Sequence, residues 1–539
     1  MVIPKFIKTW DFLFFILLIG ISFLYSYNII LWMRPYSIHQ WRQCDCLSIT
    51  LNYYKEGMHF FSPSVHMIGP SGNGMASTSE CPLIYYTVAC LWKIFGYHEF
   101  IYRLFVLTIA FTGLYALFCL TKELTGDGAW ALMVALFLFS SPIFAVYANN
   151  FLTEVPSLSV ALIAWYFFVR YYKTKLINYY DISILLFLLA GLFKISALLS
   201  FLPLIFIFIG ELFQRKNMSE NQIFIKPLRQ VVPIFLLITV MISWTSYSMY
   251  YNNLHNYDLF STRIFPFWKY DKDTLRDVTE HFYHWVIPAF YYPGTTIFIF
   301  GLFIYLLFNF RKLSRFYFWL ILSVFCGCII YLVLWYRVMD VHDYYLINLL
   351  IFIPLVLIAI LVFLKDRFHA IFISPLVKII FAIILAWNIY YCAVQINLRY
   401  PTNTLPVKKS FVVNKDTKNF WDWFYWNYDS YYKAYETITP YLRQIGISRE
   451  DKVISLPDNS INITLYLMDQ KGFSGYEIEQ GYGFGWDKNQ IMKSILALKP
   501  KYLFICNDTY LAYDWLKPLL KTKIGTYQNV NIYDLRYLN

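Results

Sequence analysis

Apolar runs of about 18 to 22 residues recur along the chain and constrain its fold more than any other feature, since roughly 20 helical residues cross the hydrocarbon core of a bilayer. Of the 539 residues, 59% are hydrophobic and only 14% are charged, whereas soluble domains carry roughly 25% charged residues. We therefore predict a polytopic all-α membrane domain with eleven spans, at residues 12–33, 101–121, 129–148, 154–172, 180–193, 196–213, 230–250, 287–309, 316–336, 345–364 and 372–393.

The distribution of basic residues predicts the orientation of these spans, because cytoplasmic loops collect Lys and Arg. If Lys5 and Lys8 place the amino terminus inside, every even-numbered span ends in a basic loop. The run 180–213 has to be split at Lys194, since a single span there would put the later basic loops outside. The first run is too long for a signal peptide and is read as a retained helix. The five basic loops contain Lys122; Arg170, Lys173 and Lys175; Arg215, Lys216, Lys226 and Arg229; Arg311, Lys312 and Arg315; Lys365 and Arg367.

This topology divides the chain into a transmembrane domain, residues 1–394, and an external domain, residues 395–539. It also places two loops outside, residues 34–100 and 251–286. In the tail, "DKVISLPD", "KYLFICND" and "NVNIYDL" predict strands, and "KNQIMKSILALKP" predicts an amphipathic helix. Strands that alternate with helices indicate a small α/β domain. The Trp- and Tyr-rich segment 415–433 is typical of a membrane interface.

Ionisable residues gather at the outer ends of the predicted spans, where each is a functional hypothesis. Carboxylates there are suited to accept a proton, and cations are suited to bind a phosphate. Together they fit transfer of a group from a lipid phosphate, with the cations stabilising the leaving group. The net charge of +12 reflects the inner loops and does not indicate nucleic-acid binding. The residues are Asp45, Glu80, Glu154, Lys194, Arg337, His342 and Asp343.

Four of these residues also have a structural explanation. Asp45 alone fits a hydrated loop, Glu154 in "TEVP" fits a helix amino terminus, and Lys194 fits a snorkelling side chain. His342 alone fits a loop histidine. A metal site is not predicted. The loop residues His255, Asp258, His281 and His284 lack ligand spacing, although Glu80 with His342 or Cys81 could in principle hold zinc.

Several motifs resemble bacterial glycosyltransferase family 39, the relatives of protein O-mannosyltransferases and of the lipid A aminoarabinose transferase. The first loop carries "HQWRQCD" at 39–45, "NYYKEGMHFFSP" at 52–63 and "SECPLIYYTVACLWKIFG" at 79–96. "NNFLTEVPSLSVALIAWYFF", "GLFKISALLSFLPL", "VHDYYLINLLIFIPLVLI" and the tail stretch "LYLMDQKGF" are similar to later motifs of that family. The chain departs from the family at Cys81, which replaces an aromatic residue.

The resemblance implies a GT-C fold and an integral-membrane inverting glycosyltransferase that uses a polyprenyl-phosphate sugar on the outer face of a bacterial inner membrane. By this resemblance Asp45 is the base, and Glu80 and Glu154 shape the acceptor and sugar site. Lys194 and Arg337 hold the donor phosphate, and His342 joins either this phosphate site or a metal. The remaining residues expected at the acceptor and sugar are His39, Arg42, Asp343 and Tyr345. No cofactor is required in such enzymes, and a divalent metal is not predicted.

Cys44 and Cys46 flank Asp45, where the family leads us to expect small or polar residues. We therefore predict a disulfide between one of them and Cys81, which would fix Asp45 relative to Glu80. The acceptor, whether lipid, glycan or protein, and the sugar are left open. So are three other functions: a transporter or flippase of lipid-linked sugars, an inactive scaffold with the same fold, and an oligosaccharide ligase.

Overall fold

A computed structural model describes residues 9–69, 71–214, 222–257, 259–260, 264–340, 342–402, 404–405, 407, 410–476 and 488–538. Lys5, Lys8, Arg215, Lys216 and Asp258, which entered the sequence predictions, lie outside these ranges. The chain forms two compact units. Unit 1 comprises Met1–Trp32, Tyr102–Trp244 and Arg263–Val407, and unit 2 comprises Met33–Ile101, Thr245–Thr262 and Lys408–Asn539.

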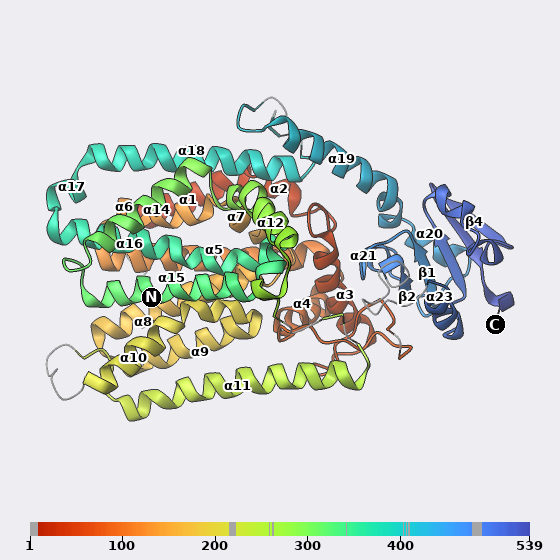
Figure 1. Cartoon of the computed structure of the whole chain (residues 1–539), viewed down its shortest axis with the longest axis horizontal. Coiled ribbons are helices and arrows are strands. Elements are labelled where there is room, and N and C mark those ends of the chain that lie inside the picture. Colours follow the sequence, from red (N-terminus) through yellow and green to blue (C-terminus); the bar gives the residue numbers. More distant parts are fainter. Residues whose placement is uncertain are drawn as a thin grey trace, which may run out of the picture. The chain divides into compact units, whose positions relative to one another are not determined.

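Unit 1 is built from apolar helices (Figure 1), and a helix or a bent pair of helices lies on each of the eleven predicted spans. Among the described residues, six helices qualify as spans by length and composition, or up to eight if each bent pair is one span. The other three predicted spans are α1, α8 and α9. The helices are α1 (Thr9–Leu24), α2 (Tyr27–Ile30), α5 (Glu99–Thr125), α6 (Gly128–Phe139), α7 (Pro142–Ala148), α8 (Glu154–Thr174), α9 (Ile177–Phe193), α10 (Leu202–Gln214), α11 (Pro227–Leu254), α12 (Lys272–His281), α13 (Ile287–Phe290), α14 (Pro293–Phe308), α15 (Arg315–Leu334), α16 (Phe352–Arg367), α17 (His369–Ile373) and α18 (Pro375–Arg399).

Two predicted spans are bent rather than straight. The axes of α6 and α7 differ by 76°, and α14 is bent by 85° from the helical stretch Lys272–Phe290 before it. In both cases a proline, Pro142 or Pro293, begins the second helix. Proline lacks a backbone N–H and fixes φ, so it is suited to start a new helix after a break. The sequence predicted one span in each of these regions, and the structure adds the bends.

The predicted break at Lys194 is confirmed. Helix α9 ends at Phe193, and Lys194 is extended, with φ −159° and ψ 121°. A 3-10 turn, Ile195–Ser200, then leads into α10. Helix α8 packs on α9 (Figure 1). Helix α10 packs on α15. Two helices that the hydropathy of residues 180–213 alone does not separate are therefore distinct elements.

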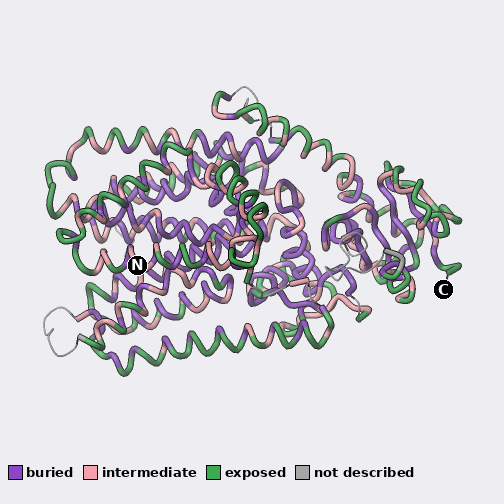
Figure 2. The backbone as a smooth tube through the Cα atoms, in the orientation of Figure 1, coloured by how far each residue is buried: buried purple, intermediate pink, exposed green. Residues whose placement is uncertain are grey.

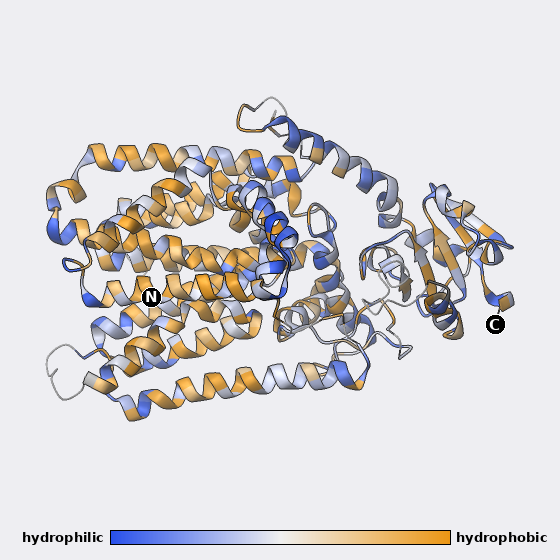
Figure 3. Cartoon of the chain, in the orientation of Figure 1, coloured by the Kyte–Doolittle hydropathy of each residue, from blue (hydrophilic) through white to orange (hydrophobic). Residues whose placement is uncertain are grey.

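The burial pattern of unit 1 shows which surfaces face lipid. Helices α6 and α7 are buried along most of their length (Figure 2). Helix α11 instead exposes large apolar side chains such as Phe235 and Ile242, and it is mostly hydrophobic in its first half (Figure 3). Extended exposed apolar surface on long helices requires a hydrocarbon environment. The chain is a multi-pass membrane protein.

Unit 2 contains a five-stranded mixed sheet in the order β2-β1-β3-β5-β4. Strands β2, β1 and β3 are parallel, and β5 is antiparallel to both β3 and β4. The predicted strands and the amphipathic helix of the tail are confirmed as β1, β3, β5 and α23, whereas β2 and β4 are additional. The strands are β1 (Val453–Leu456), β2 (Gly472–Ser474), β3 (Tyr502–Ile505), β4 (Lys523–Tyr527) and β5 (Val530–Asp534), and the helices are α3 (Gln40–Glu56), α4 (Leu83–Phe95), α19 (Lys415–Tyr431), α20 (Thr439–Gln444), α21 (Ile463–Leu467) and α23 (Lys488–Ala497).

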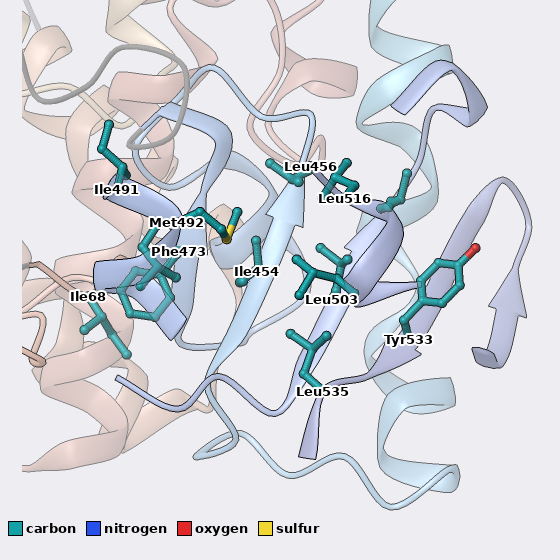
Figure 4. Close-up of a cluster of buried hydrophobic side chains, with 13 residues drawn as sticks. Ile68, Ile454, Leu456, Phe473, Ile491, Met492, Leu503, Leu516, Tyr533 and Leu535 are labelled. Carbon is teal, nitrogen blue, oxygen red and sulfur yellow. The ribbon is translucent and has the colours of Figure 1, made fainter. Parts of the chain in front are cut away.

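The first loop of the chain folds together with this sheet. Ile68 donates its N–H to the carbonyl of Gly472 at 2.7 Å, and Gly472 donates to the carbonyl of His66 at 3.2 Å. Ile68 also joins the apolar core between β1, β3 and α23 (Figure 4). A Cβ on Gly472 would lie 2.0 Å from the carbonyl oxygen of Val453 on β1. Only glycine therefore fits at this position, between β1 and residues 66–68. Residues 66–68 thus extend the sheet beyond β2.

Candidate active site

The segment around Asp45 forms helix α3, which begins directly after His39. His39 takes a left-handed backbone conformation, with φ 58°, and its ring lies 4.8 Å from that of Trp41. The helix is buried along most of its length in spite of its polar sequence. Arg42 and Asp45 are three positions apart and therefore share one face of the helix.

Asp45 is held by a residue from the far end of the chain. Its carboxylate is 2% exposed, and its Oδ1 accepts a hydrogen bond of 2.7 Å from Nδ2 of Asn462. Burial raises the pKa of Asp45 to about 6, against the lowering effects of the Arg42 charge and the Asn462 hydrogen bond. The charges of Glu80 and Asp458 raise this pKa further. A carboxyl group with this pKa is ionised at neutral pH and is more basic than an ordinary aspartate.

Two other predicted site residues of the first loop, Arg42 and Glu80, form a buried ion pair. Arg42 Nη2 donates to Glu80 Oε1 at 2.9 Å, and both side chains are almost fully buried. The pair joins α3 to the segment that precedes α4. Glu80, predicted at the acceptor and sugar site, is therefore the counter-ion of Arg42 and contributes to the electrostatic environment of Asp45.

The predicted disulfide is wrong. Within the described part of the chain Cys44, Cys46 and Cys81 all keep their thiols. All three are buried, and Cys46 Sγ instead donates to the hydroxyl of Tyr85 on α4, at 3.7 Å. Burial raises the pKa of the Cys81 thiol to about 12. The Arg42–Glu80 ion pair provides the link between the two segments that we expected from the disulfide.

A second polar cluster lies in unit 1. Lys194 Nζ is 2.9 Å from Glu154 Oε1, and the two residues are 4% and 0% exposed. The same ammonium lies 4.4 Å from the ring centre of Tyr345. Glu154 is the first residue of α8, where the helix dipole favours a negative charge. Two residues predicted in different roles, Glu154 toward the acceptor and Lys194 toward the phosphate, are thus ion-pair partners.

Neighbouring residues extend this cluster along the 3-10 helix Asp343–Ile351. Asp343 accepts a hydrogen bond of 2.6 Å from Tyr147 and lies 3.8 Å from Nη1 of Arg399. The ring of His342 lies 5.5 Å and 5.6 Å from those of Tyr344 and Tyr345. His342, Asp343 and Tyr345 therefore belong to the same part of unit 1 as Lys194.

Arg337 differs from the other predicted phosphate ligands. It lies in the 3-10 turn Tyr336–Asp340, its side chain is 42% exposed, and it forms an ion pair with Asp340. As for metal binding, the described ranges contain no group of three or more His, Cys, Asp or Glu side chains that could hold an ion.

Sequence reasoning missed four polar residues of these clusters. The proximity of Asn462 to Asp45 had no signal in the sequence, because the two residues are 417 positions apart. Asn348 is a lone amide in an apolar run, which was a usable signal. It donates to Ser157 at 3.1 Å and to Ser196 at 2.9 Å. The other two are Tyr147 and Arg399.

Unit 1 also contains a partly open apolar pocket of about 120 Å³ between α5, α8, α15 and α16. Leu117, Leu162, Trp165, Leu320 and Ile358 are among its lining residues. The lining contains none of the predicted site residues. Its chemistry suits a hydrocarbon chain rather than a polar group.

A family model described as dolichyl-phosphate-mannose-protein mannosyltransferase matches residues 79–244. A sequence search among curated proteins finds no significant match.

Three solved structures show the same architecture. ArnT from Cupriavidus metallidurans in the apo state superposes with a TM-score of 0.58 at 11% identity, covering 98% of each chain. The same protein bound to undecaprenyl phosphate gives 0.59 at 13% identity, over 97% of this chain and 98% of that one. The third structure is the archaeal oligosaccharyltransferase AglB from Archaeoglobus fulgidus in complex with an inhibitory peptide and a dolichol-phosphate. It superposes with a TM-score of 0.50 at 12% identity and covers 90% of this chain and 69% of that one. The chain has the GT-C fold, and the predicted resemblance to mannosyltransferases and the aminoarabinose transferase is confirmed.

Proposed function

We propose that the protein is an inverting glycosyltransferase that moves a monosaccharide from a polyprenyl phosphate to a lipid, glycan or protein acceptor. The observation that carries this proposal is the buried carboxylate of Asp45, with a pKa of about 6 and a neutral amide as its hydrogen-bond donor. A base in this range is strong enough to accept a proton in the transition state and is still ionised at pH 7. The ArnT complex with undecaprenyl phosphate supports the choice of donor class.

The proposed reaction is a single displacement. A hydroxyl or amino group of the acceptor attacks the anomeric carbon and gives its proton to Asp45. The bond between that carbon and the phosphate oxygen breaks, and its electron pair stays on the polyprenyl phosphate. Attack opposite the leaving group inverts the anomeric configuration. General-base catalysis of this kind contributes roughly 10²- to 10⁴-fold to the rate.

Lys194 is the proposed ligand of the leaving phosphate. Its ammonium is almost fully buried beside Glu154 and Tyr345, and a fixed cation in a dry environment stabilises developing negative charge. Arg337 is proposed as a second, more exposed ligand. Arg337 now pairs with Asp340. Exposed ion pairs of this kind contribute little stability, so a phosphate can replace Asp340 as the partner of Arg337.

The proposal also includes roles on the acceptor side for His39, Arg42, Glu80, Asp343 and Tyr345. The ion pair Arg42–Glu80 would shape the surroundings of Asp45, and Asp343 would do so near Lys194. The pocket between α5, α8, α15 and α16 offers an apolar space for part of a polyprenyl chain. We further propose that the basic loops face the cytoplasm of a bacterial inner membrane and that Asp45 acts on the outer side.

The proposal is tested with membranes that contain the full chain and a panel of radiolabelled polyprenyl-phosphate sugars. We expect the wild type to transfer one of them and Asp45→Asn to lose about a hundredfold or more of this activity. The matched control is Asp451→Asn, which removes another buried carboxylate of unit 2, one that pairs with Lys501. Full activity of Asp45→Asn would move the base to another carboxylate. Absence of transfer from every donor by folded wild type would favour the transporter or the scaffold.

A further inference from the structure

We propose that Asn462, in the C-terminal part of the chain, is a positioning residue for Asp45. Its side-chain amide holds one oxygen of the carboxylate and leaves the other to accept the proton. This inference rests on the proposed role of Asp45 as the base and deepens it.

The orientation of the Asn462 amide is fixed by its second contact. Asn462 Oδ1 accepts the backbone N–H of Met67 at 3.0 Å, so the NH₂ group of the same amide has to point toward Asp45. Asn462 is fully buried. An amide that is held on its acceptor side can only donate to Asp45, and it cannot remove the proton that the carboxylate receives.

One oxygen of Asp45 is thereby committed and the other is not. Oδ1 accepts the hydrogen bond of 2.7 Å from Asn462. In the part of the chain that the structure describes, no hydrogen bond reaches Oδ2, and this oxygen is not among the buried polar atoms that lack a partner, so it keeps some access to solvent. Oδ2 is therefore the oxygen that can take a proton from an acceptor.

The loop that carries Asn462 is rigidly held. Asp458 Oδ1 accepts the N–H of Ser460 at 3.0 Å, and its Oδ2 accepts both the N–H and the hydroxyl of Thr464, at 2.8 Å and 2.6 Å. These residues are buried, and Asn462 lies between them at the start of α21. Met67 belongs to the segment that extends the sheet beside β2. Supporting contacts of this kind hold a site residue in one geometry.

The charges around Asp45 explain why a neutral donor is useful. Arg42 is the nearby cation, and its guanidinium is shared with Glu80. Glu80 and Asp458 face Asp45 as negative charges, and Cys44 and Tyr476 are the neighbouring groups that remain neutral. The Asn462 hydrogen bond stabilises the ionised form against burial and these anions. It does so less strongly than a second cation would, so the carboxylate keeps its basicity.

The test is the pH profile of kcat/KM for full-length protein in membranes. The substrate is the radiolabelled polyprenyl-phosphate sugar that the wild type accepts. We expect the acidic limb of the wild type to have its midpoint near pH 6, following Asp45. Asn462→Ala removes a hydrogen bond to a charged group, which moves the limb upward by about one pH unit. At pH 6 the rate falls several-fold while KM for the donor stays unchanged.

A second variant guards against a simple folding defect. Asn462→Asp keeps the shape and the acceptor for Met67 but replaces the donor by a carboxylate, so the limb moves further upward. The matched control is Asn531→Ala, which breaks another amide–carboxylate hydrogen bond of unit 2, the 3.1 Å contact with Asp508. It should leave the limb at its wild-type midpoint.

The outcomes separate this inference from the proposed function. If Asp45→Asn loses transfer but both folded Asn462 variants keep the acidic midpoint of the wild-type pH profile, the role of Asn462 alone is overturned. Lower activity in both variants with an unchanged midpoint would also overturn it, because a merely structural residue gives that result. Unimpaired transfer by Asp45→Asn would instead remove the proposed function.

Discussion

The two polar clusters hold their carboxylates in opposite ways. In unit 1 the buried Glu154 has a full cation, Lys194, at 2.9 Å. In unit 2 the buried Asp45 has a neutral amide at 2.7 Å, while the nearest guanidinium is paired with Glu80. Glu154 is thus engaged by a direct cation, whereas burial raises the pKa of Asp45 to about 6 and the amide holds only one of its oxygens. We therefore propose Asp45 rather than Glu154 as the proton acceptor.

Breaking the Lys194–Glu154 pair should have the largest effect on stability. Lys194→Met leaves an uncompensated charge on buried Glu154, which costs about 3–5 kcal/mol of unfolding free energy. The double variant Lys194→Met with Glu154→Gln should recover most of that loss, since no buried charge is then left alone. Thermal unfolding in detergent measures both. A double variant as unstable as the single one would show that the two charges are not coupled.

The same double variant sharpens the functional comparison. We expect it to be stable but poor at binding the donor, because the proposed phosphate ligand is gone. Donor binding at wild-type strength would remove Lys194 from the phosphate site without affecting the role of Asp45.

The sheet that supports Asn462 should be sensitive at Gly472. Gly472→Ala places a Cβ 2.0 Å from the carbonyl oxygen of Val453, and overpacking of this kind costs about 1–3 kcal/mol. The matched control is Gly525→Ala in the same sheet, where the new Cβ would first meet the hydroxyl of Tyr441, the tip of a movable side chain. Protease resistance of the C-terminal part measures the difference. Equal resistance of both variants would contradict the close approach.

The activity of the wild type should depend on pH through Asp45. Because burial raises the pKa of this group to about 6, it is protonated and inactive as a base below that pH. Transfer should therefore rise with pH through 6 and level off above about 7, one unit beyond the midpoint. A flat profile from pH 5 to 8 would mean that no group with this pKa limits the reaction.

Arg337 should show the smallest effect on stability. Its side chain is 42% exposed and paired with Asp340, and exposed pairs contribute about 0–1 kcal/mol. Arg337→Gln should leave the unfolding temperature nearly unchanged and weaken donor binding. Unchanged donor binding, measured in the same preparation, would limit the phosphate site to the Lys194 cluster.

Much of the fold could be predicted because hydropathy and loop charge are local signals. The break at Lys194 followed from the basic loops alone, and the strands β1, β3 and β5 followed from short apolar runs. The bends before Pro142 and Pro293 were missed because a proline inside an apolar run was not weighed as the start of a new helix. Strands β2 and β4 were missed because β2 is only three residues long and β4 is largely exposed.

The roles of the candidate site residues stay predictions, and the structure adds contacts that the sequence could not supply. Asp45, Glu80, Glu154 and Lys194 stood out as charges at the outer ends of the predicted spans. Their partners depend on tertiary structure, which brings Asn462 to Asp45 across 417 positions. The disulfide prediction failed because cysteines close to a charged motif give no information on the direction of their side chains.

The most direct test of the account separates chemistry from binding in Asp45→Asn. This substitution keeps the shape of the side chain and removes its basicity. We predict that the variant binds the polyprenyl-phosphate donor as tightly as the wild type, while its single-turnover rate at pH 7 falls about a hundredfold or more. A rate within a few-fold of the wild type, in protein that binds the donor normally, would contradict the account.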